Sequence, residues 1–228
     1  MNCKQQHQQC DEIGETMDVN LCLFEDLLIA HQQLNARGLV LHLPKKSATE
    51  IAQIMQQILN ATRRYKTPFL LENMPGEPDE HATYESPEKL NRLSNELNRL
   101  VGSAAGWYYC IDTAHLWNSG VDISRASEMR KWLDELSHLT LTHVKLIHLN
   151  GSINPITIFK DTHTIPGLHD DKIWSKIPVD DNTSQKHDNQ SGFHYLVKFA
   201  KKNNISMICE VVGSNAELQH LFDKIKAI

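Results

Sequence analysis

Short apolar runs alternate along most of this chain with segments whose apolar residues follow a helical period. The apolar runs cover residues 39–42, 68–72, 107–112, 144–148 and 205–210. Strands that alternate with helices in this way are typical of βα units and a parallel sheet. The sequence therefore predicts five parallel strands, and the last residue of each predicted strand is polar.

Helix start signals support the predicted order. Ser47 with Glu50, and Ser214 with Glu217, have the spacing of a capping box ahead of an apolar stripe. Further helices are expected over residues 19–36, from residue 86, around Met129 to Leu136 and over residues 193–201, with Gly38 ending the first. Residues 170–190 are polar and aperiodic, which predicts a long exposed loop.

The strand count sets the expected fold class. A closed parallel β/α barrel, or TIM barrel, has eight strands in about 250 residues, and this chain has 228 residues. We expect residues 1–18 to be a polar leader and residues 19–228 to form one incomplete β/α barrel with about five of eight strands. Such a sheet leaves an exposed edge, which favours self-association.

Composition excludes several classes of protein. No apolar run approaches the roughly 18 residues of a membrane span, and the first residues lack a signal sequence, so we expect an intracellular, non-secreted protein. The formal net charge of -5 argues against a nonspecific DNA-binding protein. Five cysteines without a C-x-x-C pair argue against a disulfide framework, and Cys110 and Cys209 are expected to fill the core.

One charged or imidazole residue stands at the end of each predicted strand: His42, Glu72, Asp112, His148 and Glu210. In a parallel barrel these ends meet at one mouth, so the five side chains are expected to converge. Clustered carboxylates repel one another unless cations lie between them. The pattern therefore predicts a metal site.

Two further motifs extend this prediction. Asp112-Thr113-Ala114-His115 adds an imidazole just past the third strand, and Asp161-Thr162-His163 offers a carboxylate and an imidazole in a loop. Imidazole and carboxylate ligands without thiolates suit zinc, with manganese or iron as competitors. The remaining histidines lack such placement and are expected to be solvated or to pack: His31, His81, His138, His143, His169, His187, His194 and His220.

The motifs at residues 70–76, 110–115, 147–150, 161–163 and 208–210 resemble, in order and spacing, the endonuclease IV family of apurinic/apyrimidinic (AP) endonucleases, also called AP endonuclease family 2. The resemblance extends from about Val19 to the C-terminus. It implies a xylose-isomerase-like barrel that repairs DNA in base excision repair. The implied partner is double-stranded DNA with abasic sites, cut 5′ to the lesion to leave a 3′-hydroxyl.

The resemblance also implies up to three zinc ions. His42 would hold the first, Glu72 would bridge it to the second, and Asp112, His148 and Glu210 would complete the second. The third would be held by His115, Asp161 and His163. Either Glu72 or Glu210 would serve as the catalytic residue that orients the attacking hydroxide.

Some family features have no counterpart in the sequence. A further histidine on an earlier strand and the loops that penetrate DNA have no match upstream of Val19, and Asn150 is followed by Gly151 and Ser152 instead of an acidic residue. Two alternatives stay open. One is an inactive metal-binding remnant of the family, and the other is a divalent-metal sugar isomerase or epimerase on the same barrel.

Overall fold

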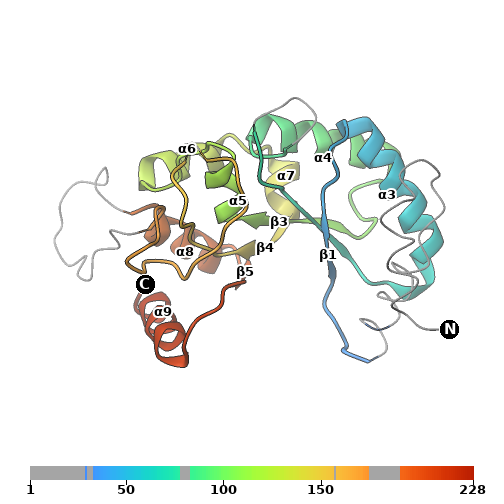
Figure 1. Cartoon of the computed structure of the whole chain (residues 1–228). Helices are drawn as coiled ribbons and strands as arrows, with labels where there is room; N and C mark the ends of the chain where they lie inside the picture. The colour runs from blue at the N-terminus through green and yellow to red at the C-terminus, as the bar shows by residue number, and fades with distance from the viewer. Residues whose placement is uncertain (1–28, 30–32, 78–82, 157, 175–190) are drawn as a thin grey trace, which may run out of the picture.

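Five parallel strands form one sheet in the order β1-β2-β3-β4-β5. Figure 1 shows this sheet with helices beside it. The computed structural model describes residue 29 and residues 33–77, 83–156, 158–174 and 191–228. The strands are β1 (Leu39–His42), β2 (Phe69–Glu72), β3 (Trp107–Asp112), β4 (Val144–His148) and β5 (Ser206–Ile208). The predicted α/β fold with a parallel sheet is confirmed.

The strand register places the polar strand ends beside one another. His42 pairs with Glu72 between β1 and β2, and Asp112 pairs with His148 between β3 and β4. Because all five strands are parallel, their carboxyl ends lie at one edge of the sheet. This register brings residues separated by more than a hundred positions in sequence to a common edge.

Helices follow the strands and form an arch beside the sheet, with the amino-terminal half at the right of Figure 1 and the carboxyl-terminal half at the left. The capping boxes predicted at Ser47 and Ser214 are both present. The described helices are α3 (Ala48–Thr62), the 3-10 turn η1 (Arg63–Tyr65), α4 (Pro87–Val101), α5 (Thr113–Asn118), α6 (Ala126–Asp134), α7 (His138–His143), α8 (Gly192–Lys202) and α9 (Asn215–Ala227).

The core lies between the strands and these helices. In α4, residues Leu90, Leu93 and Leu97 repeat at helical spacing and are fully buried. Trp107 of β3 is also fully buried, and the ring of His143 stacks on it with 3.9 Å between ring centroids. His143 is therefore a packing histidine, as the sequence predicted.

The first predicted helix and the long polar loop fall largely outside the described residues. Ile29 is helical, but Asn35 has a positive φ of 47°, so the described chain leaves the helical conformation before Gly38. A side chain at Gly38 would collide with Leu70 and with the backbone of Pro68. Gly38 thus permits close packing against β2, which differs from the helix-ending role expected for it.

The last strand is shorter than predicted. β5 covers Ser206–Ile208, so Glu210 lies two residues beyond its end. Within the described residues, β5 pairs only with β4, and β1 pairs only with β2. Ile208 is 51% exposed on this outer strand. In the part of the chain that the structure describes, no helix has the length and apolar character needed to cross a membrane.

We expect Leu93→Ala to lower the free energy of unfolding by about 2–5 kcal/mol, because it removes a fully buried side chain and leaves a cavity between α4 and the core. Urea unfolding followed by circular dichroism measures the loss. Asn95→Ala on the exposed face of the same helix is the matched control and should change stability by less than about 0.5 kcal/mol. Equal effects of the two changes would contradict the described packing of α4.

Candidate metal centre

Five strand-end residues meet at the carboxyl edge of the sheet, as the sequence predicted. Glu72, Asp112 and His148 come from the three middle strands and are buried. His42 ends the outer strand β1 and Glu210 lies two residues beyond the outer strand β5, and their side chains are 64% and 46% exposed. The middle of the cluster is therefore shielded from solvent while its two sides are open.

His148 is the centre of the first group. Its Nδ1 lies 2.9 Å from Glu72 Oε1, 2.9 Å from Glu210 Oε2 and 3.7 Å from Asp112 Oδ2. The other carboxylate oxygen of Glu72 lies 3.3 Å from His42 Nε2. Glu72 thus touches imidazoles on both sides, which is the arrangement expected of a carboxylate that bridges two ions. Ligand atoms of Glu72, Asp112, His148 and Glu210 all lie within 4.8 Å of one another.

A second group surrounds His115. Three ligand-type atoms form a nearly equilateral triangle: His115 Nε2 to His163 Nε2 at 3.3 Å, His115 Nε2 to Asp161 Oδ1 at 3.4 Å, and His163 Nε2 to Asp161 Oδ1 at 3.2 Å. Two ligands about 2.0–2.1 Å from one zinc ion at a tetrahedral angle lie about 3.3 Å apart. The triangle therefore has the size of one face of a tetrahedral zinc site.

The ring orientations in this triangle also suit metal binding. His115 Nδ1 lies 2.7 Å from the Asn73 carbonyl oxygen, and His163 Nδ1 lies 3.3 Å from the Glu210 carbonyl oxygen. A carbonyl can only accept, so each Nδ1 carries the proton and each Nε2 faces the other side of the ring. A backbone partner that fixes the tautomer in this way is typical of metal-binding histidines.

The segment after β3 is a short helix, α5, for which the sequence pattern gave no helix prediction. Asp112 is the N-cap of α5, because one of its carboxylate oxygens accepts from the His115 backbone N–H at 2.8 Å. Aspartate is a favoured N-cap residue, since it satisfies a backbone donor of the first turn. The cap holds His115 one turn from Asp112, and its ring joins the second group. The other predicted motif, at residues 161–163, lies in a loop.

Two asparagines hold Asp112 in place. Asn73 Oδ1 accepts from the Asp112 backbone N–H at 2.8 Å, which ties β2 to the end of β3. The Asn150 amide group donates to Asp112 Oδ2 at 2.7 Å, and its oxygen accepts from the Glu210 backbone N–H at 2.8 Å. Asn150 therefore links two predicted ligands on different strands. Neither amide was predicted as a site residue, although Asn73 directly follows β2 and Asn150 lies two residues beyond β4.

The carboxylate of Asp171 is buried against Gly151 and Ser152, the two residues that follow Asn150 in place of an acidic residue. Asp171 is fully buried and accepts from the backbone N–H groups of Ser152, Gly167, Ile173 and Trp174. A side chain at Gly151 would collide with this carboxylate. Asp171 thus organises the loop that carries residues 161–163, and it lay inside the segment assigned to a polar loop.

The electrostatics of the cluster depend on balanced charges. Burial alone would raise the pKa of Glu72, but hydrogen bonds from His148 and His42 outweigh it and lower the pKa to about 2. Burial opposes protonation of His115, yet Asp161 and Asp112 raise its pKa to about 9. The pKa of Asp112 is raised, chiefly by burial. In the absence of cations, protonated imidazoles thus supply the positive charge that the carboxylates need.

Cys110 and Trp117 have different environments. Trp117 is buried, and its indole N–H donates to the Asn154 carbonyl at 2.9 Å, so it packs. Cys110 is fully buried, as predicted for a core residue, but its sulfur lies within 4.8 Å of ligand atoms of Glu72 and His148. Burial raises the pKa of the Cys110 thiol. Because Cys110 stands in an apolar run of the sequence, its closeness to Glu72 and His148 was not predicted.

Comparison with known sequences finds relatives that are described as endonucleases. The "Probable endonuclease 4" of Mycoplasmopsis synoviae (strain 53) is 29% identical over 170 residues, which cover 64% of this chain and 55% of the relative. That of Mycoplasma mobile is 33% identical over 135 residues, covering 56% and 44%. The "Probable AP endonuclease" of African swine fever virus (isolate Tick/Malawi/Lil 20-1/1983) is 26% identical over 200 residues, covering 86% and 62%.

These relatives confirm the resemblance to the endonuclease IV family that the motifs indicated. The matched region spans about half of the length of these relatives, from 44% to 62%. No family model matches the chain.

Solved structures confirm the fold class. "The crystal structure of AsfvAP:AG" superposes with a TM-score of 0.68 at 24% identity and covers 90% of this chain and 66% of its own. A xylose isomerase domain containing protein from Salmonella typhimurium LT2 has a TM-score of 0.52 at 14% identity, covering 91% and 68%. A D-tagatose 3-epimerase-like protein has a TM-score of 0.51 at 12% identity, covering 92% and 71%. The sheet is therefore of the xylose-isomerase-like type.

We expect the cation-free chain to lose stability as the pH rises from about 6.5 to about 9. The folded pKa of His115 is raised to about 9, so its stabilising charge is fully present below pH 6.5 and is lost as the pH passes the folded value. Urea unfolding in a chelating buffer at several pH values measures this. His220→Gln, far from the cluster in α9, should keep the trend, whereas His115→Gln should flatten it. A flat profile for the unchanged chain would contradict the described ion pairs.

Proposed function

We propose that this relative of the endonuclease IV family is a metal-dependent AP endonuclease of base excision repair, and that residues 19–228 form its nuclease domain. It would hydrolyse the phosphodiester 5′ to an abasic site in double-stranded DNA and leave a 3′-hydroxyl. The observation that carries the proposal is the pair of ligand groups at one sheet edge, joined through Asp112. The sequence relatives, described as probable endonuclease 4 and probable AP endonuclease, support an AP endonuclease activity.

The proposed ligands divide between the two groups. The first contains Glu72 as the bridging carboxylate with His42 on one side and His148, Asp112 and Glu210 on the other. The second contains His115, Asp161 and His163. Divalent cations bound there would act as Lewis acids on a phosphodiester and would activate water as the nucleophile. Imidazole and carboxylate ligands suit up to three zinc ions, with manganese or iron as alternatives.

Glu72 and Glu210 are the proposed catalytic residues. Glu72 is buried and held between His42 and His148, so its carboxylate is fixed in position and suited to orient an attacking water. Glu210 is held at its backbone by Asn150, while its side chain is half exposed and accessible to a substrate. The two carboxylates, one at the end of β2 and one just beyond β5, approach the same imidazole nitrogen. A phosphate would therefore meet both from the open side of the edge.

The triangle of His115, Asp161 and His163 favours phosphodiester hydrolysis over sugar isomerisation. A proton shuttle between sugar carbons uses one or two cations, so a separate group with the size of a tetrahedral site is not needed there. In hydrolysis an additional cation stabilises negative charge on the attacking and leaving oxygens. An inactive remnant would keep the ligands without the reaction, so incision distinguishes it. We place the proposed activity inside the cell, where repair of DNA takes place.

Incision of a labelled duplex with one synthetic abasic site tests the proposal. We expect the zinc-loaded chain to cut 5′ to the lesion and Glu72→Gln to reduce cutting by at least about 100-fold, because the variant loses the carboxylate that orients water. Glu88→Gln is the matched control, since Glu88 lies on the exposed surface of α4 and should leave incision unchanged.

The possible outcomes separate the three candidate functions. Incision that is unchanged in Glu72→Gln would contradict the assignment of Glu72. If the chain binds zinc but does not cut the duplex, the result would contradict the nuclease proposal and favour the inactive remnant. A duplex without the abasic site should remain uncut, and its cleavage would contradict specificity for the lesion.

We also propose that two copies of the chain associate through the β5 edge. Ile208 is 51% exposed there, and an outer strand offers unpaired backbone groups to another strand. Sedimentation velocity should therefore detect a dimer or larger species. Ile208→Lys should shift the chain toward monomer, because a charged side chain opposes edge pairing. Phe222→Lys on α9, at 47% exposure, is the matched control. A monomer at all concentrations would contradict the proposal.

A further inference from the structure

Cys110 occupies a position in the sheet that the proposed centre does not use. It lies on β3 two residues before Asp112, and residues two apart in a strand point to the same face. Its side chain is therefore on the face that carries the metal ligands, one layer further from the mouth. The register places Glu72 directly beside Cys110 on β2.

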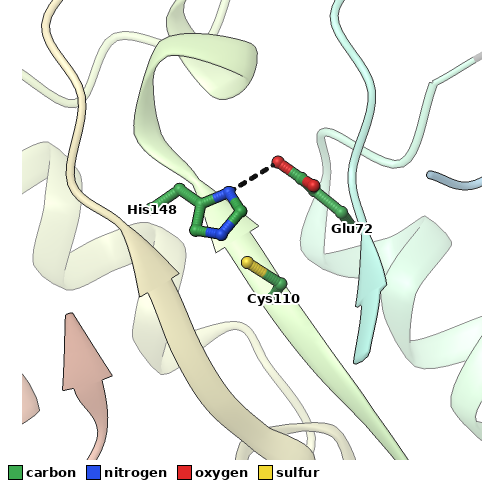
Figure 2. Close-up of side chains that lie close together, drawn as sticks. All are labelled: Glu72, Cys110 and His148. Carbon is green, nitrogen blue, oxygen red and sulfur yellow. Dashed lines mark hydrogen bonds and ion pairs between the residues drawn. The ribbon is translucent and has the colours of Figure 1, made fainter. Parts of the chain in front are cut away.

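Three different ligand types converge at this layer. The sulfur of Cys110, a carboxylate oxygen of Glu72 and a ring nitrogen of His148 all lie within 4.8 Å of one another. All three residues are buried, and they come from the neighbouring strands β2, β3 and β4. Figure 2 shows the sulfur on the side of the His148 ring that lies away from its bond to Glu72. The three side chains thus form one buried group around the His148 ring.

The dimensions of the group suit a cation with a thiolate ligand. A sulfur about 2.3 Å and a nitrogen about 2.0–2.1 Å from one zinc ion lie about 3.5 Å apart at a tetrahedral angle. The ligand atoms of the three residues lie within 4.8 Å of one another, and a bound cation would draw them to that spacing. Thiolate ligands favour soft and borderline cations over magnesium or calcium. Cys110 would therefore give this position a different metal preference from the groups nearer the mouth.

We propose that Cys110, Glu72 and His148 form a second, deeper position for a soft divalent cation such as cadmium or zinc. The thiol proton of Cys110 leaves to the solvent as the sulfur–metal bond forms. Glu72 and His148 also belong to the proposed hydrolytic centre, so a cation at the deeper position draws both side chains away from the mouth. The position is thus a site at which soft cations would compete with the proposed catalytic ions.

Cadmium binding to a single-thiol chain tests the proposal without any need for nuclease activity. The 228-residue chain is prepared with Cys3, Cys10, Cys22 and Cys209 changed to serine, which leaves Cys110 as the only thiol. Titration of the reduced, metal-free protein with cadmium should produce the ultraviolet charge-transfer band of a cadmium thiolate. One proton per bound cation should appear in a weakly buffered solution. Added zinc should remove the band, and added magnesium should not.

Two further variants make the outcome decisive. Cys110→Ser in the same background should lose the band, while circular dichroism checks that the chain is still folded. Glu72→Gln keeps the thiol and should move the cadmium titration to higher concentrations, which a thiol that binds alone would not do. A folded single-thiol chain without the band would overturn the proposal, as would a titration that Glu72→Gln leaves unchanged. Neither result would bear on incision of abasic DNA by the unchanged chain.

Discussion

Mutual repulsion among carboxylates at the carboxyl edge of a parallel sheet is the constraint on which this structure depends. The buried carboxylates of Glu72 and Asp112 both lie close to Nδ1 of His148, and Glu210, just beyond β5, reaches the same nitrogen. Burial disfavours such charges unless opposite charge is close. In the cation-free chain, His42, His115, His148 and His163 supply it as protonated imidazoles, each with a raised pKa. Divalent cations would take over this role when the imidazoles lose their protons, so acidity and metal binding oppose each other here.

The periodic part of the fold could be predicted from the sequence because it depends on neighbours in the chain. The strands at residues 39–42, 107–112 and 144–148 and the capping boxes at Ser47 and Ser214 have the predicted bounds or partners. Convergence of the strand ends followed from parallel topology alone. In contrast, α5 was missed because Asp112 closes a strand and opens a helix at the same residue. An apolar run that ends in a polar residue predicts the end of a strand, but it does not predict that the same residue caps a helix.

Contacts that depend on folding in three dimensions were beyond the sequence pattern. Asp171 looked like one residue of a polar loop, yet four backbone donors surround it. Asn73 and Asn150 hold Asp112 from two sides, and neither amide has a spacing that marks it. Cys110 fits an apolar run and also faces Glu72 and His148. In each case the side chain contacts a partner on another strand or loop. The spacing of apolar and polar residues along the sequence does not indicate such a partner.

The tight fit between Gly151 and Asp171 has a consequence for how this segment can vary. A β-carbon at residue 151 would lie 2.7 Å from the Asp171 carboxyl carbon, so any residue other than glycine would force that carboxylate to shift. The two positions should therefore change together during evolution. A chain that acquires an acidic or other side chain directly after Asn150 needs a smaller residue at 171 and another acceptor for the four backbone donors. The residues at positions 151 and 171 therefore depend on each other. Exchanging only one of them for the residue of a relative would disturb the loop that carries Asp161 and His163.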